Sequence, residues 1–121
     1  MKKLIYTLLI IIALTNNSFA AGSSSDSDST PKASDYTKAK NLIKAAKKYE
    51  KKGKIDKAQE RYAKAQKLLL KSNEIKPLQA DTLNYLGFTT RKLGDYEKGE
   101  KFYLLGLQVE PNHNGINEYL G

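Results

Sequence analysis

A proline and a Tyr-Leu-Gly triplet each occur twice in the second half of the chain, with the same spacing between the two copies. Pro77 and Pro111 lie 34 residues apart, and the Tyr-Leu-Gly triplet at 85–87 recurs at 119–121 with the same spacing. A fixed period of this length is the signature of a repeat architecture, in which each unit buries its apolar face against the next. Such a fold displays an extended surface and encloses no reaction chamber, so the period favours a binding protein.

From residue 35 onward the sequence has helical periodicity. Apolar and small residues recur every three or four positions, and no segment alternates with period two, so no sheet is expected. Gly53 and Gly94 are expected to end the first and third helices. Pro77 and Pro111 lie beyond the second and fourth, and a fifth begins near Asn114. The expected core stripes are Leu42, Ala45, Ala46 and Tyr49; Ala58, Tyr62, Ala65 and Leu69; Leu83, Leu86, Gly87 and Thr90; and Gly99, Tyr103, Gly106 and Leu107.

Side chains that can cap helices stand at the expected helix starts. Ser34 or Asp35 precedes the first helix. Asp56 stands at the start of the second, and Asp95 at the start of the fourth. Their oxygens can accept hydrogen bonds from the free N–H groups of a first turn. The sequence therefore predicts an all-α fold.

Residues 1–20 have the pattern of a secretory signal peptide. Lys2 and Lys3 give a positive start, and an almost unbroken apolar run follows at 4–14. The segment closes with small residues around a cleavage site, which we place after Ala20. At about 1.5 Å per residue, the apolar run reaches only about half of a ~30 Å hydrocarbon core, so a retained anchor is the poorer interpretation.

Residues 21–34 are rich in serine and contain no large apolar side chain. They cannot bury enough surface to offset their ordering entropy, so we expect a flexible linker that precedes a domain at 35–121. The chain contains no cysteine, which excludes disulfides, thiol catalysis and a lipid-modified cysteine. Together with the signal, this predicts a bacterial protein that is periplasmic or secreted.

The chain is basic. Its formal net charge is +8, and loss of the signal removes two lysines and no acid, which leaves +6. For an exported protein, the anionic partners would be acidic protein segments, lipid headgroups or cell-wall polymers, and nucleic acid is less expected. The simpler interpretation of many of these lysines is that they are solvated on helix surfaces.

The helical units resemble the tetratricopeptide repeat family, whose pattern combines a tryptophan, a leucine-glycine pair, a tyrosine, an alanine, a phenylalanine and a proline. Residues 80–113 match it closely: Leu86-Gly87 and Pro111 are direct matches. At the other positions, Leu83 replaces the tryptophan, Thr90 the tyrosine, Gly99 the alanine and Tyr103 the phenylalanine.

The resemblance implies a solenoid of antiparallel helix pairs, with units at 39–78 and 80–113 and the start of a third at 114–121. The first unit is seven residues longer than the period, and we expect this insertion to add about two turns to its second helix. The third unit would be truncated, which suggests that the parent protein continues. If the chain is complete, the exposed apolar face beyond Gly106 should drive self-association.

In this family the first helix of each unit lines a concave groove that grips peptides. The resemblance therefore implies a groove that combines cations with aromatic side chains, which suits an acidic segment with an apolar anchor. Tyr85 and Phe88 are the sharpest candidates, but each could instead pack against the preceding helix or under the third unit. The expected groove residues are Lys40, Lys44, Lys47 and Lys51 from the first unit, and Asn84, Tyr85, Phe88, Arg91 and Lys92 from the second.

The sequence favours a non-catalytic scaffold that binds a protein or peptide partner in the bacterial cell envelope. The alternative is an electrostatic binder of an anionic polymer or lipid surface, which would use the four lysines of the first unit and would weaken steeply with salt.

Nothing in the sequence indicates catalysis. His113 is the only histidine and is expected to be a turn residue, with no second zinc ligand nearby. Glu50 and Glu97 occur among lysines on helices and are expected to form weak surface ion pairs. We expect no catalytic site, metal, cofactor or small-molecule substrate, and an enzyme would need residues beyond Gly121.

Overall fold

The computed structural model describes residues 34–120, which form five α-helices and contain no strand. The all-α prediction is confirmed for this part of the chain. The predicted signal peptide at 1–20, the linker up to residue 33 and the last residue lie outside the described residues. No helix within 34–120 is long and apolar enough to cross a bilayer. The helices are α2 (Asp35–Lys51), α3 (Ile55–Ile75), α4 (Ala80–Lys92), α5 (Tyr96–Val109) and α6 (Asn114–Leu120).

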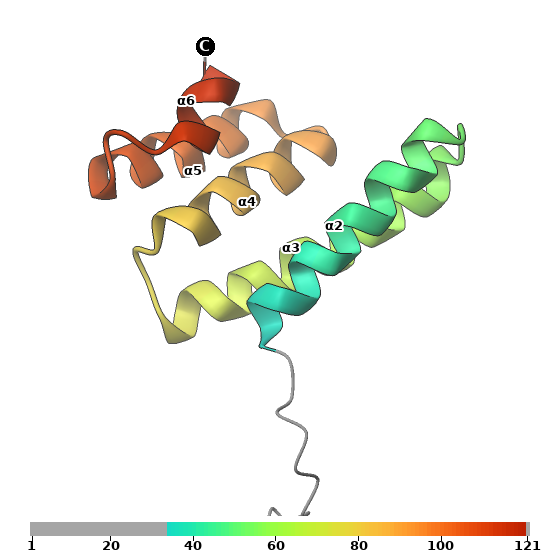
Figure 1. Cartoon of the computed structure of the whole chain (residues 1–121), viewed down its shortest axis with the longest axis horizontal. Coiled ribbons are helices and arrows are strands. Elements are labelled where there is room, and N and C mark those ends of the chain that lie inside the picture. The colour runs from blue at the N-terminus through green and yellow to red at the C-terminus, as the bar shows by residue number, and fades with distance from the viewer. Residues whose placement is uncertain (1–33, 121) are drawn as a thin grey trace, which may run out of the picture. The chain divides into compact units, whose positions relative to one another are not determined.

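The helices pack mainly with their neighbours in the sequence (Figure 1). α2 lies along α3 and α4 lies along α5, so each pair forms an antiparallel hairpin. α3 joins the two pairs by packing against α4, and α6 packs on α5. The turn of each hairpin contains a glycine with positive φ, 73° at Gly53 and 99° at Gly94. Since side chains disfavour this region, glycine suits both turns and ends the preceding helix.

Two of the predicted helix caps are present. The Ser34 hydroxyl accepts a hydrogen bond from a backbone N–H in the first turn of α2, and the Asp95 carboxylate does the same for α5. The prediction for Asp56 was wrong, because α3 already begins at Ile55. The Asp56 carboxylate lies inside the first turn, where the positive end of the helix dipole still favours a negative charge.

The buried face of α2 is rotated relative to the predicted one. Ala39, Ile43 and Ala46 are buried, whereas Leu42 and Tyr49 are only partly covered. The reason is that α2 packs almost wholly against α3 and barely touches α4, so only a narrow stripe is enclosed. Residues one position away lie about 100° around the helix, at the edge of this contact.

The predicted core of α3 is confirmed. Ala58, Tyr62, Ala65 and Leu69 are all fully buried. α3 has 21 residues and α5 has 14, so α3 is longer by seven residues, or about two turns, which is the length expected from the sequence. Near the C-terminal end of α3 the apolar side chains are only partly buried, since Leu70 is 38% exposed.

Glycines allow α4 and α5 to approach each other closely. A Cβ atom at Gly87 of α4 would lie 2.5 Å from ring atoms of Tyr103 on α5. A Cβ atom at Gly99 of α5 would lie 2.5 Å from Cγ of Arg91 on α4. Each glycine therefore leaves the space that a large side chain of the partner helix occupies. The side chain fills this space and makes close dispersion contacts with the glycine backbone.

The short helix α6 is held by one buried side chain and one histidine. Ile116 is fully buried in the space that Gly106 leaves on α5. His113 Nδ1 accepts a hydrogen bond from the Ile116 N–H at 3.2 Å, so in the neutral ring the proton is on Nε2. Nε2–H donates a hydrogen bond to the Asp81 carboxylate, with 2.6 Å between the heavy atoms. His113 is therefore more than a turn residue, because it caps α6 and ties it to α4.

The glycine contact predicts a large penalty for a single added methyl group. Gly87→Ala should destabilise the fold by about 1–3 kcal/mol, because the new Cβ overlaps the Tyr103 ring. Urea unfolding of the single and double variants measures this. The penalty should shrink on a Tyr103→Leu background, where the ring is gone; equal penalties on both backgrounds would show that the ring is not the cause.

The histidine cap predicts that α6 loosens without it. His113→Ala removes the acceptor for the Ile116 N–H and the bond to Asp81, and should weaken α6 by roughly 1 kcal/mol. Amide hydrogen exchange should accelerate in α6 and stay unchanged in α2. Asp81→Asn serves as the milder control, since it keeps a hydrogen-bond acceptor beside the ring. Unchanged α6 protection in His113→Ala would contradict the capping role.

Candidate functional site

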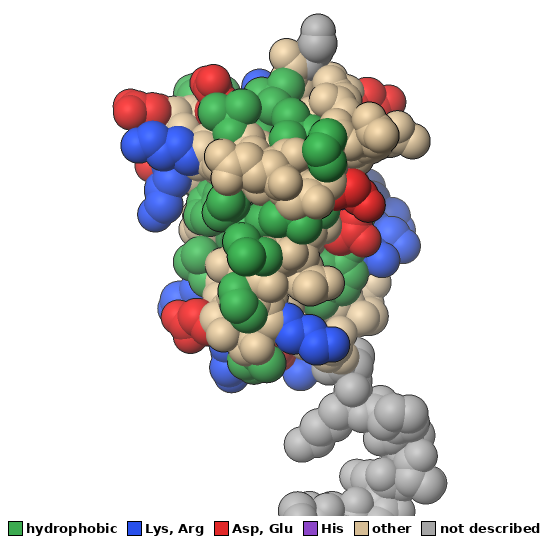
Figure 2. Space-filling model, turned by 90° about the vertical axis from the view of Figure 1, so that its left-hand side faces the viewer, with side chains coloured by type: hydrophobic (Ala, Val, Ile, Leu, Met, Phe, Trp, Pro, Cys, Tyr) green, Lys and Arg blue, Asp and Glu red, His purple; other side chains and the backbone are tan. Residues whose placement is uncertain are grey.

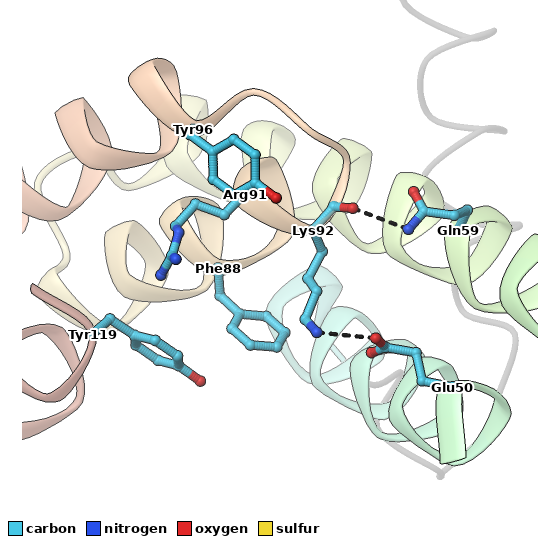
Figure 3. Close-up of a pocket in the computed structure, with 7 residues that line it drawn as sticks. All are labelled: Glu50, Gln59, Phe88, Arg91, Lys92, Tyr96 and Tyr119. Carbon is cyan, nitrogen blue, oxygen red and sulfur yellow. Dashed lines mark hydrogen bonds and ion pairs between the residues drawn. The ribbon is translucent and has the colours of Figure 1, made fainter. Parts of the chain in front are cut away.

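A hollow beside α4 is lined by side chains from all five described helices (Figure 3). It has a volume of about 410 Å³. α4 supplies the floor and one wall, and α2, α3, α5 and α6 contribute at least one side chain each. Its lining residues are Glu50, Gln59, Phe88, Arg91, Lys92, Tyr96 and Tyr119.

A second hollow of about 300 Å³ continues from the first. Arg91, Tyr96 and Tyr119 line both. Figure 3 shows the Arg91 side chain extending from α4 toward the space between the rings of Phe88 and Tyr119. The second hollow adds Glu100, Tyr103 and Leu120 to the lining. We call the two together the α4 groove.

The floor of the α4 groove is aromatic. Phe88 packs edge-on against Tyr62 of α3, with 5.8 Å between ring centroids, and is tilted against Tyr119 of α6 at 5.4 Å. Tyr119 in turn stacks on Tyr103 at 5.5 Å, with 9° between the ring planes. Phe88 is only 8% exposed, because it packs against the preceding helix, α3, and against α6, as the alternative interpretation of the sequence held. It forms part of the floor and does not project as an anchor.

Glu50 and Lys92 join the two helix pairs at one edge of the groove. Lys92 Nζ lies 3.0 Å from the Glu50 carboxylate, which also accepts a hydrogen bond from the Tyr62 hydroxyl. Gln59 donates to the Lys92 carbonyl oxygen at 3.0 Å, and both contacts are drawn in Figure 3. Glu50 was expected to form a weak surface pair. It is instead a partly buried connection between α2, α3 and α4.

The ionisation of Glu50 reflects this environment. Burial alone would raise its pKa, but the hydrogen bonds from Tyr62 and Lys92 and the charges of Lys92 and Lys47 outweigh burial and hold the pKa below its ordinary value of 4.5. Glu50 is therefore ionised at neutral pH and neutralises Lys92.

Arg91, which lines the groove, and Lys47, which lies beside it over the Phe88 ring, have no carboxylate within ion-pair distance among residues 34–120. The Arg91 guanidinium lies 5.8 Å from the centre of the Tyr96 ring, and Lys47 Nζ lies 4.8 Å from the centre of the Phe88 ring. Cation–π contacts of this kind hold the cations in place without neutralising them.

The Tyr103 hydroxyl is buried in the second hollow. No acceptor for its proton lies within hydrogen-bond distance in the described part of the chain. Burial raises the pKa of Tyr103 to about 12, although the neighbouring Arg91 guanidinium opposes the rise through its charge and a hydrogen bond to the hydroxyl oxygen, so the hydroxyl keeps its proton. A buried donor without an acceptor is unusual in proteins and calls for an explanation.

The structure gathers some of the sequence-predicted groove residues and separates others. Lys47, Phe88, Arg91 and Lys92 meet at the α4 groove. Tyr85 is half-buried against Tyr36, with ring centroids 5.9 Å apart, and Lys40 lies over the same Tyr36 ring at 5.3 Å. Asn84 packs beside the backbone of Gly115, and its side-chain oxygen is buried without a partner. Lys44 and Lys51 are exposed on α2.

Sequence reasoning missed several lining residues. Glu50 was assigned to the surface, Gln59 and Tyr96 were not considered, and Tyr119 was used only as a landmark of the period. The period itself held a usable signal for Tyr119, because it stands one unit after Tyr85. No local signal pointed to Gln59, whose role depends on a backbone atom 33 residues away.

A third hollow of about 310 Å³ lies on another face, between the start of α4 and the end of α5. Figure 2 looks onto the side where the 76–79 and 110–113 connections lie, and shows hydrophobic side chains in a broken column. Leu78 and Val109, both exposed, line this hollow together with Asp81 and Glu110. It contains no cation, and both of its carboxylates lie within 4 Å of His113, so it is the poorer candidate for ligand binding.

Comparison with known proteins identifies no relative: the chain matches no known protein family, no curated protein and no solved structure. The case for a function therefore rests on geometry. Among residues 34–120, no group of three or more His, Asp and Glu side chains is placed to hold a metal ion. What the α4 groove offers chemically is an aromatic floor, the Arg91 cation with Lys47 nearby, and the Tyr103 hydroxyl, which has no acceptor among residues 34–120.

The Glu50 connection predicts a specific acid sensitivity. Its pKa is lower in the folded than in the unfolded protein, so its stabilisation is complete above about pH 4.5 and is lost as the pH falls through the folded pKa. Glu50→Gln should cost about 1–2 kcal/mol at neutral pH and make the fold less sensitive to acid. Thermal unfolding at neutral and acid pH measures both effects.

Glu97→Gln is the matched control for Glu50→Gln. Glu97 pairs with Lys101 at 3.8 Å, and both side chains are largely exposed. This change should therefore leave the loss of thermal stability between neutral and acid pH unchanged. Parallel pH profiles for Glu50→Gln and the unmodified protein would contradict the assignment.

Proposed function

We propose that the chain is a tetratricopeptide-like solenoid that acts as a non-catalytic scaffold and binds an extended peptide segment of a partner protein. The repeat assignment is supported by residues 41 positions apart with matching environments in the two hairpins. Gly53 and Gly94 have positive φ in the two turns, and the other pairs are buried in both units. These pairs are Ala46 and Gly87, Ala58 and Gly99, Tyr62 and Tyr103, and Ala65 and Gly106.

The observation that carries the function is the composition of the α4 groove. A hollow lined by side chains from five helices is suited to an extended ligand that crosses several elements, as in other helix-pair grooves. Its aromatic floor supplies apolar contact area, and Arg91 and Lys47 supply uncompensated positive charge. Such a lining fits a segment that carries both acidic and apolar side chains.

Binding to an anionic polymer or lipid surface is the second candidate. One observation favours it: Lys40, Lys44, Lys47 and Lys51 of α2 make no ion pair with any residue in 34–120. A row of unpaired lysines on one helix suits a repeating anion. This mode would depend on charge density and not on the aromatic floor.

The cellular setting of the proposal is the bacterial envelope or the outside of the cell. It rests on the signal-like segment at 1–20 and on the absence of cysteine from the sequence. The partner is a protein, and self-association through the C-terminal unit is a further mode for the same scaffold.

The scaffold proposal predicts retention of peptides through the α4 groove. The chain without residues 1–20 is immobilised and challenged with a random peptide library in low salt and in about 1 M salt, where the Debye length is about 3 Å. Enrichment of sequences with acidic and apolar residues is expected in both conditions. Tyr96→Ala should reduce retention by about fivefold or more, since Tyr96 is an exposed wall of the groove.

Ile75→Ala is the control, because Ile75 is equally exposed but lies at the end of α3, outside the groove lining. Equal losses in both variants would place binding elsewhere. If retention is lost in high salt and shows no sequence preference, the result contradicts the peptide-binding scaffold and supports binding to an anionic polymer or lipid surface.

A further inference from the structure

The α4 groove has a defined electrostatic centre, and this inference rests on the function proposed above. We propose that Arg91 is the anion-binding residue of the groove and that its ligand is a single carboxylate next to an aromatic side chain within a partner peptide. The ligand is an internal acidic–aromatic segment. Four features of the groove lead to this assignment.

The first feature is the distribution of charge among the lining residues. Lys92 is neutralised by Glu50 at 3.0 Å, so it offers little to a ligand. Arg91 has no carboxylate within ion-pair distance in residues 34–120, and it lines both hollows. The unmatched positive charge of the groove lining is therefore concentrated at Arg91, because Lys47 lies over the Phe88 ring, lines neither hollow and acts on the charge of Glu50.

The second feature is that Arg91 is already positioned. Its stem packs where Gly99 leaves space on α5, and its guanidinium lies 5.8 Å from the centre of the Tyr96 ring. A preordered guanidinium loses little freedom when it binds, and its planar fork matches the two oxygens of a carboxylate. A solvated surface lysine has neither property.

The third feature is the free hydroxyl of Tyr103. Tyr103 is fully buried, lines the second hollow together with Arg91, and its hydroxyl has no acceptor in the described part of the chain. The Arg91 guanidinium lies beside this hydroxyl and lowers the pKa of Tyr103 against the effect of burial, but a guanidinium can only donate hydrogen bonds. A carboxylate bound to Arg91 would bring into this hollow the acceptor that both groups lack.

The fourth feature limits the ligand. Glu100 lines the second hollow with Arg91 and makes no ion pair within residues 34–120, whereas the charge of Glu50 in the first hollow is already balanced by Lys92. A phosphate or a densely charged polymer would be repelled by Glu100, whereas one carboxylate would not exceed the positive charge of Arg91. The rings of Phe88, Tyr96 and Tyr119 then provide the contact area for an aromatic neighbour.

The chain contains no tryptophan, which makes a tryptophan in the ligand a clean fluorescent probe. The probe is a short peptide with blocked ends and one tryptophan next to a single glutamate. A second peptide has glutamine in place of glutamate. A third has no acidic side chain and ends in tryptophan with a free carboxylate. Each is titrated with the chain lacking residues 1–20 at physiological salt.

The glutamate–tryptophan peptide should bind about tenfold or more tightly than its glutamine counterpart, because only it offers Arg91 a carboxylate. Arg91→Gln should reduce its affinity by a similar factor, and Arg91→Lys by less, since the charge stays but the fork is lost. Lys67→Gln is the matched control, because Lys67 is exposed on α3, away from the groove. The affinity of this variant for the glutamate–tryptophan peptide should stay within about twofold of that of the unmodified protein. Circular dichroism checks that each variant keeps its helices.

The failures are distinguishable. If the glutamine peptide binds equally well, or Arg91→Gln and Arg91→Lys both bind unchanged, the carboxylate assignment is wrong while the peptide groove stands. If only the peptide with the free C-terminal carboxylate binds, the ligand is a chain end and not an internal segment. If neither these peptides nor any from the random library bind, the proposed function fails together with this inference.

Discussion

Close packing between α4 and α5 is the constraint on which the rest of the structure depends. Gly87 and Gly99 each leave room for a large side chain of the other helix, Tyr103 and Arg91 respectively. Added methyl groups at these positions would overlap their partners, so helix separation and side-chain placement are coupled. Because interiors pack at nearly crystalline density, such a contact has little tolerance. The same two glycines therefore determine where the groove's cation and its free hydroxyl lie, and Tyr119 extends the arrangement by stacking on Tyr103.

The two hairpins meet through polar contacts as well as apolar ones. Glu50 accepts hydrogen bonds from Tyr62 and Lys92, and Gln66 donates to Thr90 at 2.9 Å. A partly buried ion pair contributes little net stability, because desolvation offsets the attraction, but breaking one partner is costly. We interpret this set of contacts as fixing the angle between hairpins, which keeps Phe88 on the groove floor. Stability and ligand geometry thus depend on the same residues at this joint.

Local patterns predicted the helices well and the site only in part. The turn glycines, the Ser34 and Asp95 caps and the whole stripe of α3 follow from spacing within one element. The rotation of the α2 stripe was missed because it depends on how little of α2 touches α4. Phe88 could not be placed because its burial comes from Tyr62 and Tyr119, which lie 26 and 31 residues away.

The contrast between the lysines of α2 and Arg91 shows which charges can give specificity. Lys44 and Lys51 are exposed, and long flexible side chains in water lose entropy when they bind and are screened by salt. Arg91 is partly buried, with its stem against Gly99 of α5 and its guanidinium over the Tyr96 ring, so part of its side-chain entropy has already been lost in folding. Under the proposed function, the lysines would attract an acidic partner from a distance. Selection among acidic partners would depend on Arg91, because it is the cation without an ion-pair partner that lines both hollows.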